Sequence, residues 1–295
     1  MPVLTEIRDA IAKLAGQVGP SLVGVGQRWG IGSGVVLAPG KVLTNAHNVR
    51  GEEVAITFAD GRTETGTVTG IDVDGDLAVV TVDTKDAPPI TWTSDESPTI
   101  GNPVFALANP GGRGLRVTVG LVSGTERSFR GPRGRRISGS LEHTAPLLPG
   151  SSGGPIVDEA GMLLGLNTNR LGEGFYLAIP ADATLRVRVD SLGRGEAPER
   201  PRLGVAIAPS NVARRLRRAV GLPEADGLLV RGVEEDSPAA HAEIREGDLI
   251  SAAGDKPLRD PDELHAVLDS LAAGATLKLT VLRGTEERQV TVSFS

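Results

Sequence analysis

The sequence contains one serine whose setting suits a nucleophile. Ser152 lies in the segment 149–155, directly before Gly153 and Gly154 and ahead of an apolar pair. Glycine accepts backbone angles that a Cβ forbids, and it lets another chain approach closely. Such a turn can expose a hydroxyl and direct several N–H groups at one point, as an oxyanion hole requires. The same residues also suit a simple glycine-rich loop between two strands, so the segment alone leaves both interpretations open.

A serine nucleophile needs a base beside it and a third group that orients the base. His47 follows the apolar strand pattern of residues 42–44, and Asp76 directly precedes the apolar run 77–82. The chain order His47, Asp76, Ser152 is one of the known orders for this catalytic geometry. We therefore expect Ser152 to be the nucleophile, His47 the base and Asp76 the orienting acid. The remaining histidines suit the role less well: His143, His241 and His265.

The elements that must position these residues are predominantly strands. A chain of 295 residues is long enough for about two domains, and with 39% hydrophobic but 3% aromatic residues its cores must consist of aliphatic side chains. The 39 glycines and 20 prolines separate many short apolar runs. This spacing of short strands and turns favours a closed antiparallel barrel or a pair of barrels.

Charge and composition exclude several classes of protein. A net charge of -6 argues against a general nucleic-acid binder, and the absence of cysteine excludes disulfides, cysteine metal sites and a thiol nucleophile. We expect no metal, no cofactor and no nucleic-acid partner. No run approaches the roughly 18 apolar residues of a membrane span. The first ten residues also lack the basic start and apolar stretch of a signal peptide, so with Met1 as the natural start we expect a cytoplasmic protein.

Helix signals occur at both ends of the chain. Leu4, Ile7, Ile11 and Leu14 recur at helical spacing, with Thr5 as the expected cap. Residues 194–201 are charged and proline-containing, which is typical of a linker. Beyond it, strands alternate with helices in a small α+β module. In this module Asp260 is expected to cap a helix whose first residue is Pro261.

Two basic segments have a structural and a functional interpretation each. Residues 127–136 contain five arginines among glycine and proline, which favours a solvated connection; the alternative is a regulatory or anion-sensing loop near the serine turn. A second cluster comprises Arg214, Arg215, Arg217 and Arg218. It favours a solvated helix face, and the alternative is a site for phosphate or an acidic partner.

The ordered motifs resemble the HtrA (Deg) family of serine proteases, in which a chymotrypsin-like domain precedes a peptide-binding PDZ domain. The resemblance covers almost the whole chain. In the first part it rests on Gly32-Ser33-Gly34-Val35, Thr44-Asn45-Ala46-His47, Asp76-Leu77-Ala78-Val79, Asn109-Pro110-Gly111-Gly112, Pro149-Gly150-Ser151-Ser152-Gly153-Gly154-Pro155 and Ala178-Ile179-Pro180. In the second part it rests on Gly227-Leu228-Leu229-Val230, Ser237-Pro238-Ala239-Ala240 and Glu246-Gly247-Asp248-Leu249-Ile250. It implies a mostly β fold, a double antiparallel barrel over residues 1–193, a linker at 194–201 and a small α+β PDZ domain at 202–295.

The resemblance also implies roles for individual residues. The N–H groups of Gly150 and Ser152 would form the oxyanion hole, with that of Ser151 nearby. The substrate pocket would be lined from the segments 144–148 and 167–170, chiefly by Thr144, Pro146, Leu147, Leu148, Asn167 and Thr168. This set has no acidic side chain, so we expect a small or aliphatic substrate residue to fit. In the second domain the carboxylate of a peptide C-terminus would bind at Arg202, Leu203, Gly204 and Val205, and the peptide would add as a strand beside residues 205–207.

The function implied is ATP-independent cleavage of unfolded or damaged proteins, by a protein that family members suggest is a homotrimer, with no membrane partner. Six positions depart from the family pattern: Asn48, Thr144, Pro146, Leu148, Ser151 and Glu243. Because Leu148 and Ser151 belong to the serine turn, an alternative is open. In that alternative the catalytic domain is silent and the protein acts as a peptide-binding protein or a holdase.

Overall fold

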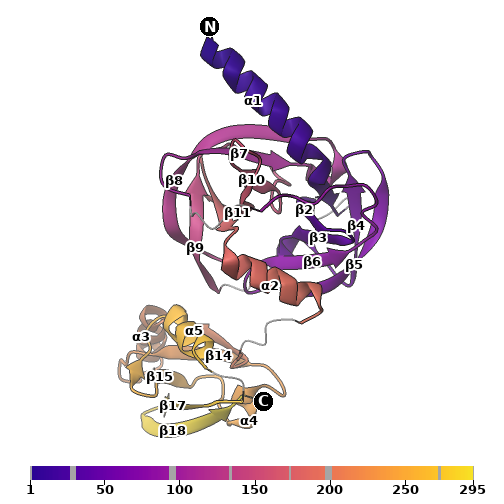
Figure 1. Ribbon diagram of the computed structural model, residues 1–295. Helices are drawn as coiled ribbons and strands as arrows, with labels where there is room; N and C mark the ends of the chain where they lie inside the picture. The colour runs from indigo at the N-terminus through magenta and orange to yellow at the C-terminus, as the bar shows by residue number, and fades with distance from the viewer. Residues whose placement is uncertain are drawn as a thin grey trace. The chain divides into compact units, whose positions relative to one another are not determined.

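The computed structural model describes residues 2–26, 31–92, 98–132, 135–172, 174–196, 201–271 and 274–294. The chain forms two compact units, Met1–Pro198 and Glu199–Ser295 (Figure 1). Part of the expected linker, residues 197–200, lies outside the described residues. The predicted mostly β fold is confirmed, and each unit is described separately below.

The first unit contains two closed antiparallel barrels of six strands each. The first barrel has the strand order β1-β2-β3-β6-β5-β4. Its strands are β1 (Leu22–Val25), β2 (Gly32–Ala38), β3 (Lys41–Thr44), β4 (Glu53–Phe58), β5 (Thr63–Asp72) and β6 (Leu77–Thr81). Alternate side chains point inward, and those inside are mainly valines, which fit the low aromatic content.

The second barrel has the order β10-β11-β12-β9-β8-β7. Its strands are β7 (Pro103–Ala108), β8 (Arg116–Arg130), β9 (Arg136–His143), β10 (Pro155–Val157), β11 (Leu163–Gly172) and β12 (Phe175–Pro180). The long strands β8 and β11 extend beyond the barrel. Strand β10 pairs with β11 as far as Leu166, which pairs with Pro155. Asn167 then bonds to Gly153 and Gly154, and beyond it this edge of β11 has no backbone hydrogen bond to a described residue.

Helices and short 3-10 turns complete the first unit. They are α1 (Pro2–Val18), η1 (Gly19–Ser21), η2 (Ala46–Asn48), η3 (Pro110–Gly112) and α2 (Ala183–Gly193). The expected N-terminal helix is present, but Thr5 lies inside it, so the prediction that Thr5 caps the helix is wrong. In α2 the side chain of Asp182 accepts a hydrogen bond from the N–H of Leu185, which is the normal N-cap arrangement.

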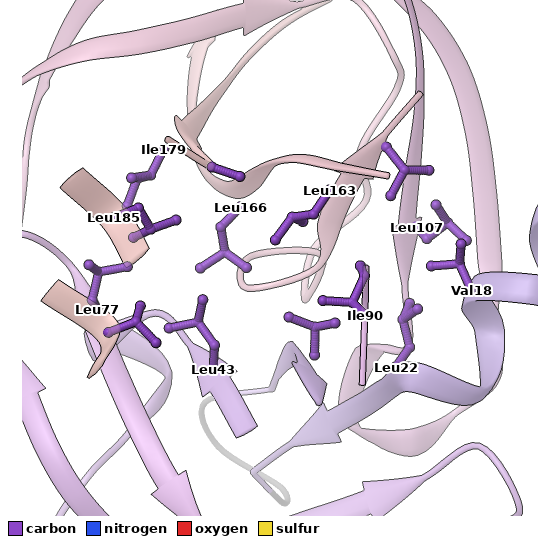
Figure 2. Packing of buried hydrophobic residues seen from close by; sticks show 14 of the residues in the cluster. Val18, Leu22, Leu43, Leu77, Ile90, Leu107, Leu163, Leu166, Ile179 and Leu185 are labelled. Carbon is purple, nitrogen blue, oxygen red and sulfur yellow. The ribbon is translucent and has the colours of Figure 1, made fainter. Parts of the chain in front are cut away.

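A shared apolar core joins the two barrels. Figure 2 shows Leu43 and Leu77 of the first barrel facing Leu163 and Leu166 of the second, and all four side chains are fully buried. Leu14 and Val18 of α1 and Leu185 of α2 belong to the same cluster. Because burial of one such side chain contributes roughly 1.5–3 kcal/mol, this core fixes the position of one barrel against the other, and residues from both barrels can then form one site.

The second unit is a sheet with the order β13-β14-β15-β17-β18, and β16 pairs with β15. Its elements are β13 (Val205–Ala208), α3 (Ser210–Ala219), β14 (Leu228–Val233), α4 (Pro238–His241), β15 (Leu249–Ala253), β16 (Lys256–Pro257), α5 (Pro261–Asp269), β17 (Thr276–Arg283) and β18 (Glu286–Ser293). Helix α5 begins at Pro261, and Asp260 forms a capping box with Glu263. Strand β13 lies at one end of the sheet order.

The two arginine-rich segments, 127–136 and the cluster in α3, differ in structure. Residues 127–136 are not a loose connection: β8 extends to Arg130, β9 begins at Arg136, and Arg135 is buried (Arg133 and Gly134 lie outside the described residues). In α3, Arg214 pairs with Asp226 and Arg218 with Glu224. Arg217 is buried and donates to the carbonyl groups of Pro223 and Gly284. Most of this cluster therefore stabilises its own domain.

Among the described helices, none has the length and apolar character to cross a bilayer.

Candidate active site

His47 and Asp76 come together because the strands that precede and follow them are paired. Strand β3 ends at Thr44, which pairs with Ala78 of β6, and His47 lies in the turn η2 just beyond β3. His47 Nδ1 is 2.9 Å from each carboxylate oxygen of Asp76. The backbone N–H of His47 also donates to Asp76 Oδ1 at 3.2 Å. The carboxylate therefore orients the ring so that Nε2 is the nitrogen available for proton transfer.

Asp76 is buried and held from several sides. Its backbone is in the left-handed region, with φ 54°, which non-glycine residues adopt at a cost. Thr168 Oγ1 donates to Asp76 Oδ2 at 2.6 Å, and Asn45 Nδ2 donates to the Asp76 carbonyl at 3.0 Å. These contacts determine both the backbone and the carboxylate orientation, which is how such a conformation persists at a functional site.

Two arginines, the half-buried Arg188 and the buried Arg135, hold the turn before Asp76. Arg188 of α2 pairs with Asp72 at 2.6 Å, and Asp72 also accepts the N–H of Gly75 at 2.9 Å. Arg135 Nη1 lies 3.6 Å from Asp74 Oδ2. The three acidic residues of this turn therefore have separate partners, and Asp76 is the one whose carboxylate binds the histidine.

The turn at Ser152 crosses two glycines with left-handed backbones, Gly150 with φ 87° and Gly153 with φ 84°. A Cβ on Gly153 would lie 2.1 Å from the Ser33 carbonyl, and one on Gly150 would lie 2.8 Å from Pro110 Cβ. Both positions therefore require glycine for backbone angle and for space. Ser152 Oγ donates to the Thr168 carbonyl at 3.1 Å, so for proton transfer the hydroxyl must turn from this carbonyl to the imidazole of His47.

The amide groups of the turn divide into two sets. The N–H groups of Ser151, Gly153 and Gly154 donate to the carbonyls of Leu148, Asn167 and Ser151. The N–H groups of Gly150 and Ser152 donate no hydrogen bond to any described residue. Ser151 therefore cannot donate to an oxyanion without breaking its turn, and we leave it out of the proposed oxyanion hole. The two unpaired N–H groups suit an oxyanion.

Ser33 and Asn48, both in the first barrel's half of the unit, hold the serine turn. The N–H of Ser33 donates to the Ser152 carbonyl at 2.8 Å, and Ser33 Oγ donates to the Gly150 carbonyl at 2.8 Å. Asn48 Nδ2 donates to the Ser152 carbonyl at 3.0 Å and to Thr44 Oγ1 at 3.0 Å. The asparagine that departs from the family pattern thus links the histidine turn directly to the nucleophile. The sequence signal for this role was a polar residue at a position where the family commonly has an apolar one.

These groups line one cleft with a volume of about 480 Å³. Of the predicted pocket residues, Leu147, Leu148, Asn167 and Thr168 line it, whereas Thr144 and Pro146 are not among its lining residues. Thr144 instead exchanges backbone and side-chain hydrogen bonds with Leu121 of β8. Asn169 and Arg170 of β11, in the predicted segment 167–170, also line it. The lining residues that the sequence did not predict come from β8, the turn after it, β12 and the serine turn: Phe129, Arg130, Gly131, Pro132, Tyr176 and Pro149.

His143 lies behind the cleft and not beside Ser152. It is fully buried, and its Nε2 is 2.9 Å from Asn167 Oδ1. Its ring stacks on Tyr176 with centroids 5.8 Å apart. Burial lowers the pKa of His143 to about 4, partly offset by the hydrogen bond with Asn167. His143 is therefore neutral near pH 7, and it supports Asn167, whose backbone pairs with Gly153 and Gly154.

The second unit contains the loop expected to bind a peptide C-terminus. The carbonyls of Leu203 and Gly204 accept hydrogen bonds from Ala239 and Glu234. Their own N–H groups donate to no described residue. Gly204 has φ 76°, and a Cβ there would lie 2.2 Å from Ser237 Cβ. Val205 begins β13, and the exposed Arg202 pairs with Glu234 at 3.2 Å.

Metal chemistry has no candidate ligand set in the described ranges, where no group of three or more His, Asp or Glu residues could hold an ion. The chemistry available at the cleft is therefore that of a hydroxyl, an imidazole held by a carboxylate, and two unpaired amide N–H groups. This set can perform acyl transfer.

Comparison with known proteins agrees with this geometry. Residues 32–166 match a trypsin-like peptidase domain, and residues 201–294 match a PDZ domain. The putative serine protease HhoA of Synechocystis sp. is 34% identical over 279 residues, which cover 89% of this chain and 70% of that protein. The chain belongs to the HtrA (Deg) family of serine proteases.

Two further relatives and one solved structure are similar to most of this chain. A probable periplasmic serine endoprotease DegP-like of Halomonas elongata is 31% identical over 90% of this chain, and the chloroplastic protease Do-like 1 of Arabidopsis thaliana is 30% identical over 90%. This chain spans 56% and 63% of the lengths of these two relatives. The solved HtrA-type protease AlgW with decapeptide is 26% identical with a TM-score of 0.70, over 96% of this chain and 97% of that one.

The relatives contradict one expectation from the sequence. Their names assign them to the periplasm or the chloroplast. The prediction of a cytoplasmic protein, which depended on Met1 being the natural start, is therefore wrong.

Proposed function

We propose that this protein is a serine endopeptidase that hydrolyses peptide bonds of unfolded or damaged proteins without ATP. The observation that carries the proposal is that His47, held by Asp76, lines the same cleft as Ser152 and two amide N–H groups without partners. Membership of a serine protease family supports the same activity. None of the steps needs a nucleotide, because the chain's own groups supply the nucleophile, the base and the charge stabilisation.

In this mechanism Ser152 Oγ attacks the scissile carbonyl carbon while His47 Nε2 accepts its proton. Asp76 holds the Nδ1–H of His47 and stabilises the imidazolium without taking the proton. The N–H groups of Gly150 and Ser152 donate to the oxyanion. The imidazolium then protonates the leaving amine, and water hydrolyses the acyl-enzyme with His47 again as the base.

An unfolded polypeptide suits the surroundings of the cleft. Leu148 in the serine turn and Leu171 and Phe175 of the β11–β12 hairpin are 58%, 49% and 46% exposed. Exposed apolar groups around a cleft favour a substrate with exposed apolar side chains. For the residue at the scissile bond we retain the expectation of a small or aliphatic side chain, since the lining includes Phe129, Leu147 and Tyr176.

The second unit would bind a peptide C-terminus. We propose that the carboxylate accepts hydrogen bonds from the N–H groups of Leu203 and Gly204, and that the peptide extends along the outer edge of β13. Val205 and Ile207 pack against the apolar cluster that contains Leu264 of α5, so side chains of the peptide would meet an apolar surface there. A homotrimer stays a prediction, which light scattering of the full chain tests.

The decisive experiment combines labelling with proteolysis. A serine-directed fluorophosphonate should label the wild-type protein, and casein should be cleaved. Ser152→Ala should abolish both, because it removes the attacking atom. Binding of a fluorescent C-terminal peptide should be unchanged in this variant. If the folded wild-type protein neither labels nor cleaves under any condition but still binds the peptide, the silent binding protein is the correct reading.

A further inference from the structure

The cleft has a charge opposite to that of the protein. The chain has a net charge of -6, yet two arginines, Arg130 and Arg170, line the cleft. Among the described residues that line it, Asp76 is the only carboxylate, and its oxygens are already engaged by His47 and Thr168. The residues that face a bound substrate are therefore cationic or neutral.

Arg170 is positioned for a ligand by its own hairpin. Its Nε donates to the carbonyl of Gly172 at 2.8 Å, and its guanidinium carbon lies 5.9 Å from the centroid of Tyr176. The Nη groups of this exposed arginine donate to no described residue. A guanidinium fixed through Nε and the ring face has lost part of its rotamer freedom before it binds, and its outer edge suits a carboxylate.

The register of β11 relates Arg170 to the reacting atoms. The Thr168 carbonyl contacts Ser152 Oγ, and Arg170 follows two residues later on the same strand. A β-bulge interrupts β11 between Asn167 and Asn169. Thr168 and Arg170 nevertheless both line the cleft. On the β10-facing edge of β11, backbone hydrogen bonds to described residues end at Asn167, which pairs with Gly153 and Gly154. A substrate strand along the edge beyond Asn167 would bring a residue near the scissile bond to Arg170. Arg130 reaches the cleft from the end of β8.

We propose that the cleft selects polypeptide segments with an acidic side chain, Asp or Glu, within a few residues of the scissile bond. Arg170 is the residue that binds this side chain, and Arg130 adds positive charge to the cleft. This inference rests on the proposed endopeptidase activity. Under this inference the substrate has an acidic residue near the scissile bond, in addition to the small or aliphatic residue expected at the scissile bond itself. Neither arginine acts on the reacting atoms, so both determine specificity and neither is catalytic.

The test uses the full chain and a set of quenched fluorescent peptides with one cleavable bond after valine. A single residue is varied as Glu, Gln or Lys at each position from four before to three after that bond. At the position that reaches Arg170, Glu should raise kcat/KM about twofold to fivefold over Gln, and Lys should lower it by a similar factor, as expected for one exposed ion pair. The preference should shrink at 1 M salt.

Variants assign the effect to the arginines. The Glu-to-Gln ratio of kcat/KM should approach one in Arg170→Gln, persist largely in Arg170→Lys, and fall in part in Arg130→Gln. Arg116→Gln is the matched control, because Arg116 is an exposed arginine at the other end of β8 and does not line the cleft. The ratio in that variant should equal the wild-type ratio.

The possible failures are distinguishable. Equal kcat/KM for Glu and Gln peptides at every position, or a full preference retained in Arg170→Gln, would overturn this inference while leaving the protease assignment intact. Absence of cleavage of every peptide, together with absence of fluorophosphonate labelling, would instead overturn the proposed activity.

Discussion

Two loops of this protein present unpaired amide N–H groups for a negative charge, and they are supported in different ways. In the serine turn, the N–H groups of Gly150 and Ser152 are set by contacts with Ser33 and Asn48, more than 100 residues earlier in the chain. In the PDZ loop, those of Leu203 and Gly204 are set by backbone bonds to Glu234 and Ala239 of the same small domain.

The difference follows from the charge that each loop is proposed to hold. An oxyanion exists only during the reaction, so its donors must already be in place and the catalytic groups must meet there to a fraction of an ångström. A peptide carboxylate is a stable ligand, which a loop at a sheet edge can bind with its backbone alone. The serine turn therefore depends on buried side chains from both barrels, and the PDZ loop depends on local backbone geometry.

The largest effect should come from the group that orients His47. Asp76→Asn should lower kcat about 10⁴-fold, because an amide can leave the imidazole in the wrong tautomer. Peptide binding by the PDZ unit should not change. Steady-state kinetics on a peptide substrate measure the first effect, and fluorescence anisotropy measures the second. If Asp76→Asn lowered both kcat and peptide binding, the serine turn and the PDZ loop would not be independently supported.

The buried histidine behind the serine turn should make stability depend on pH. The folded-state pKa of His143 is about 4, below the usual 6.5. Between pH 6.5 and 4 the unfolded chain therefore takes up a proton that the folded chain does not, and the free energy of unfolding falls by about 3 kcal/mol as the pH is lowered across this window. Urea titrations of the protease unit's transition should show a shallower fall in His143→Gln. An unchanged slope would contradict this assignment.

Removal of one side-chain support should damage the serine turn selectively. Ser33→Ala loses the hydrogen bond to the Gly150 carbonyl and leaves the buried N–H of Asn109 without its acceptor. We expect kcat to fall about 30-fold, equivalent to about 2 kcal/mol. Ser123→Ala is the control, since its hydroxyl contacts Glu142 and does not line the cleft. Equal kcat in Ser33→Ala and the wild type would show that the turn holds its shape without Ser33.

The smallest effect should be confined to the PDZ loop. Gly204→Ala adds a Cβ 2.2 Å from Ser237 Cβ at a residue with φ 76°. Movement of the loop should weaken binding of a C-terminal peptide about tenfold, with kcat on a short peptide unchanged. Gly221→Ala has the same φ but no atom within 4 Å of the added Cβ. Gly221→Ala therefore shows, in calorimetric binding measurements, the effect of backbone strain without a clash like that between the new Cβ and Ser237 in Gly204→Ala. Unchanged affinity in Gly204→Ala would place the carboxylate elsewhere.

The cleft wall illustrates the limits of prediction from sequence. Leu147 and Leu148 were predicted to line it because the family resemblance places the segment before Ser152 in the substrate pocket. Arg130 and Tyr176 were not predicted, since they reach the cleft only through the pairing of β8, β9 and β12. The basic segment 127–136 was interpreted as solvated for the same reason: nothing local indicates that Arg135 would be buried against Asp74.

The sequence by itself determined the features that depend on neighbouring residues. These include the strand-rich pattern, the glycines that the serine turn requires, the cap at Asp260 and the order of His47, Asp76 and Ser152. Only the tertiary structure decided which amide N–H groups of that turn donate to no described residue. It also decided that the Asn48 side chain donates to the Ser152 carbonyl and that Arg130 lines the cleft. These features depend on contacts between residues far apart in the chain. The packing of the two barrels sets such contacts, and no local segment of the sequence determines that packing.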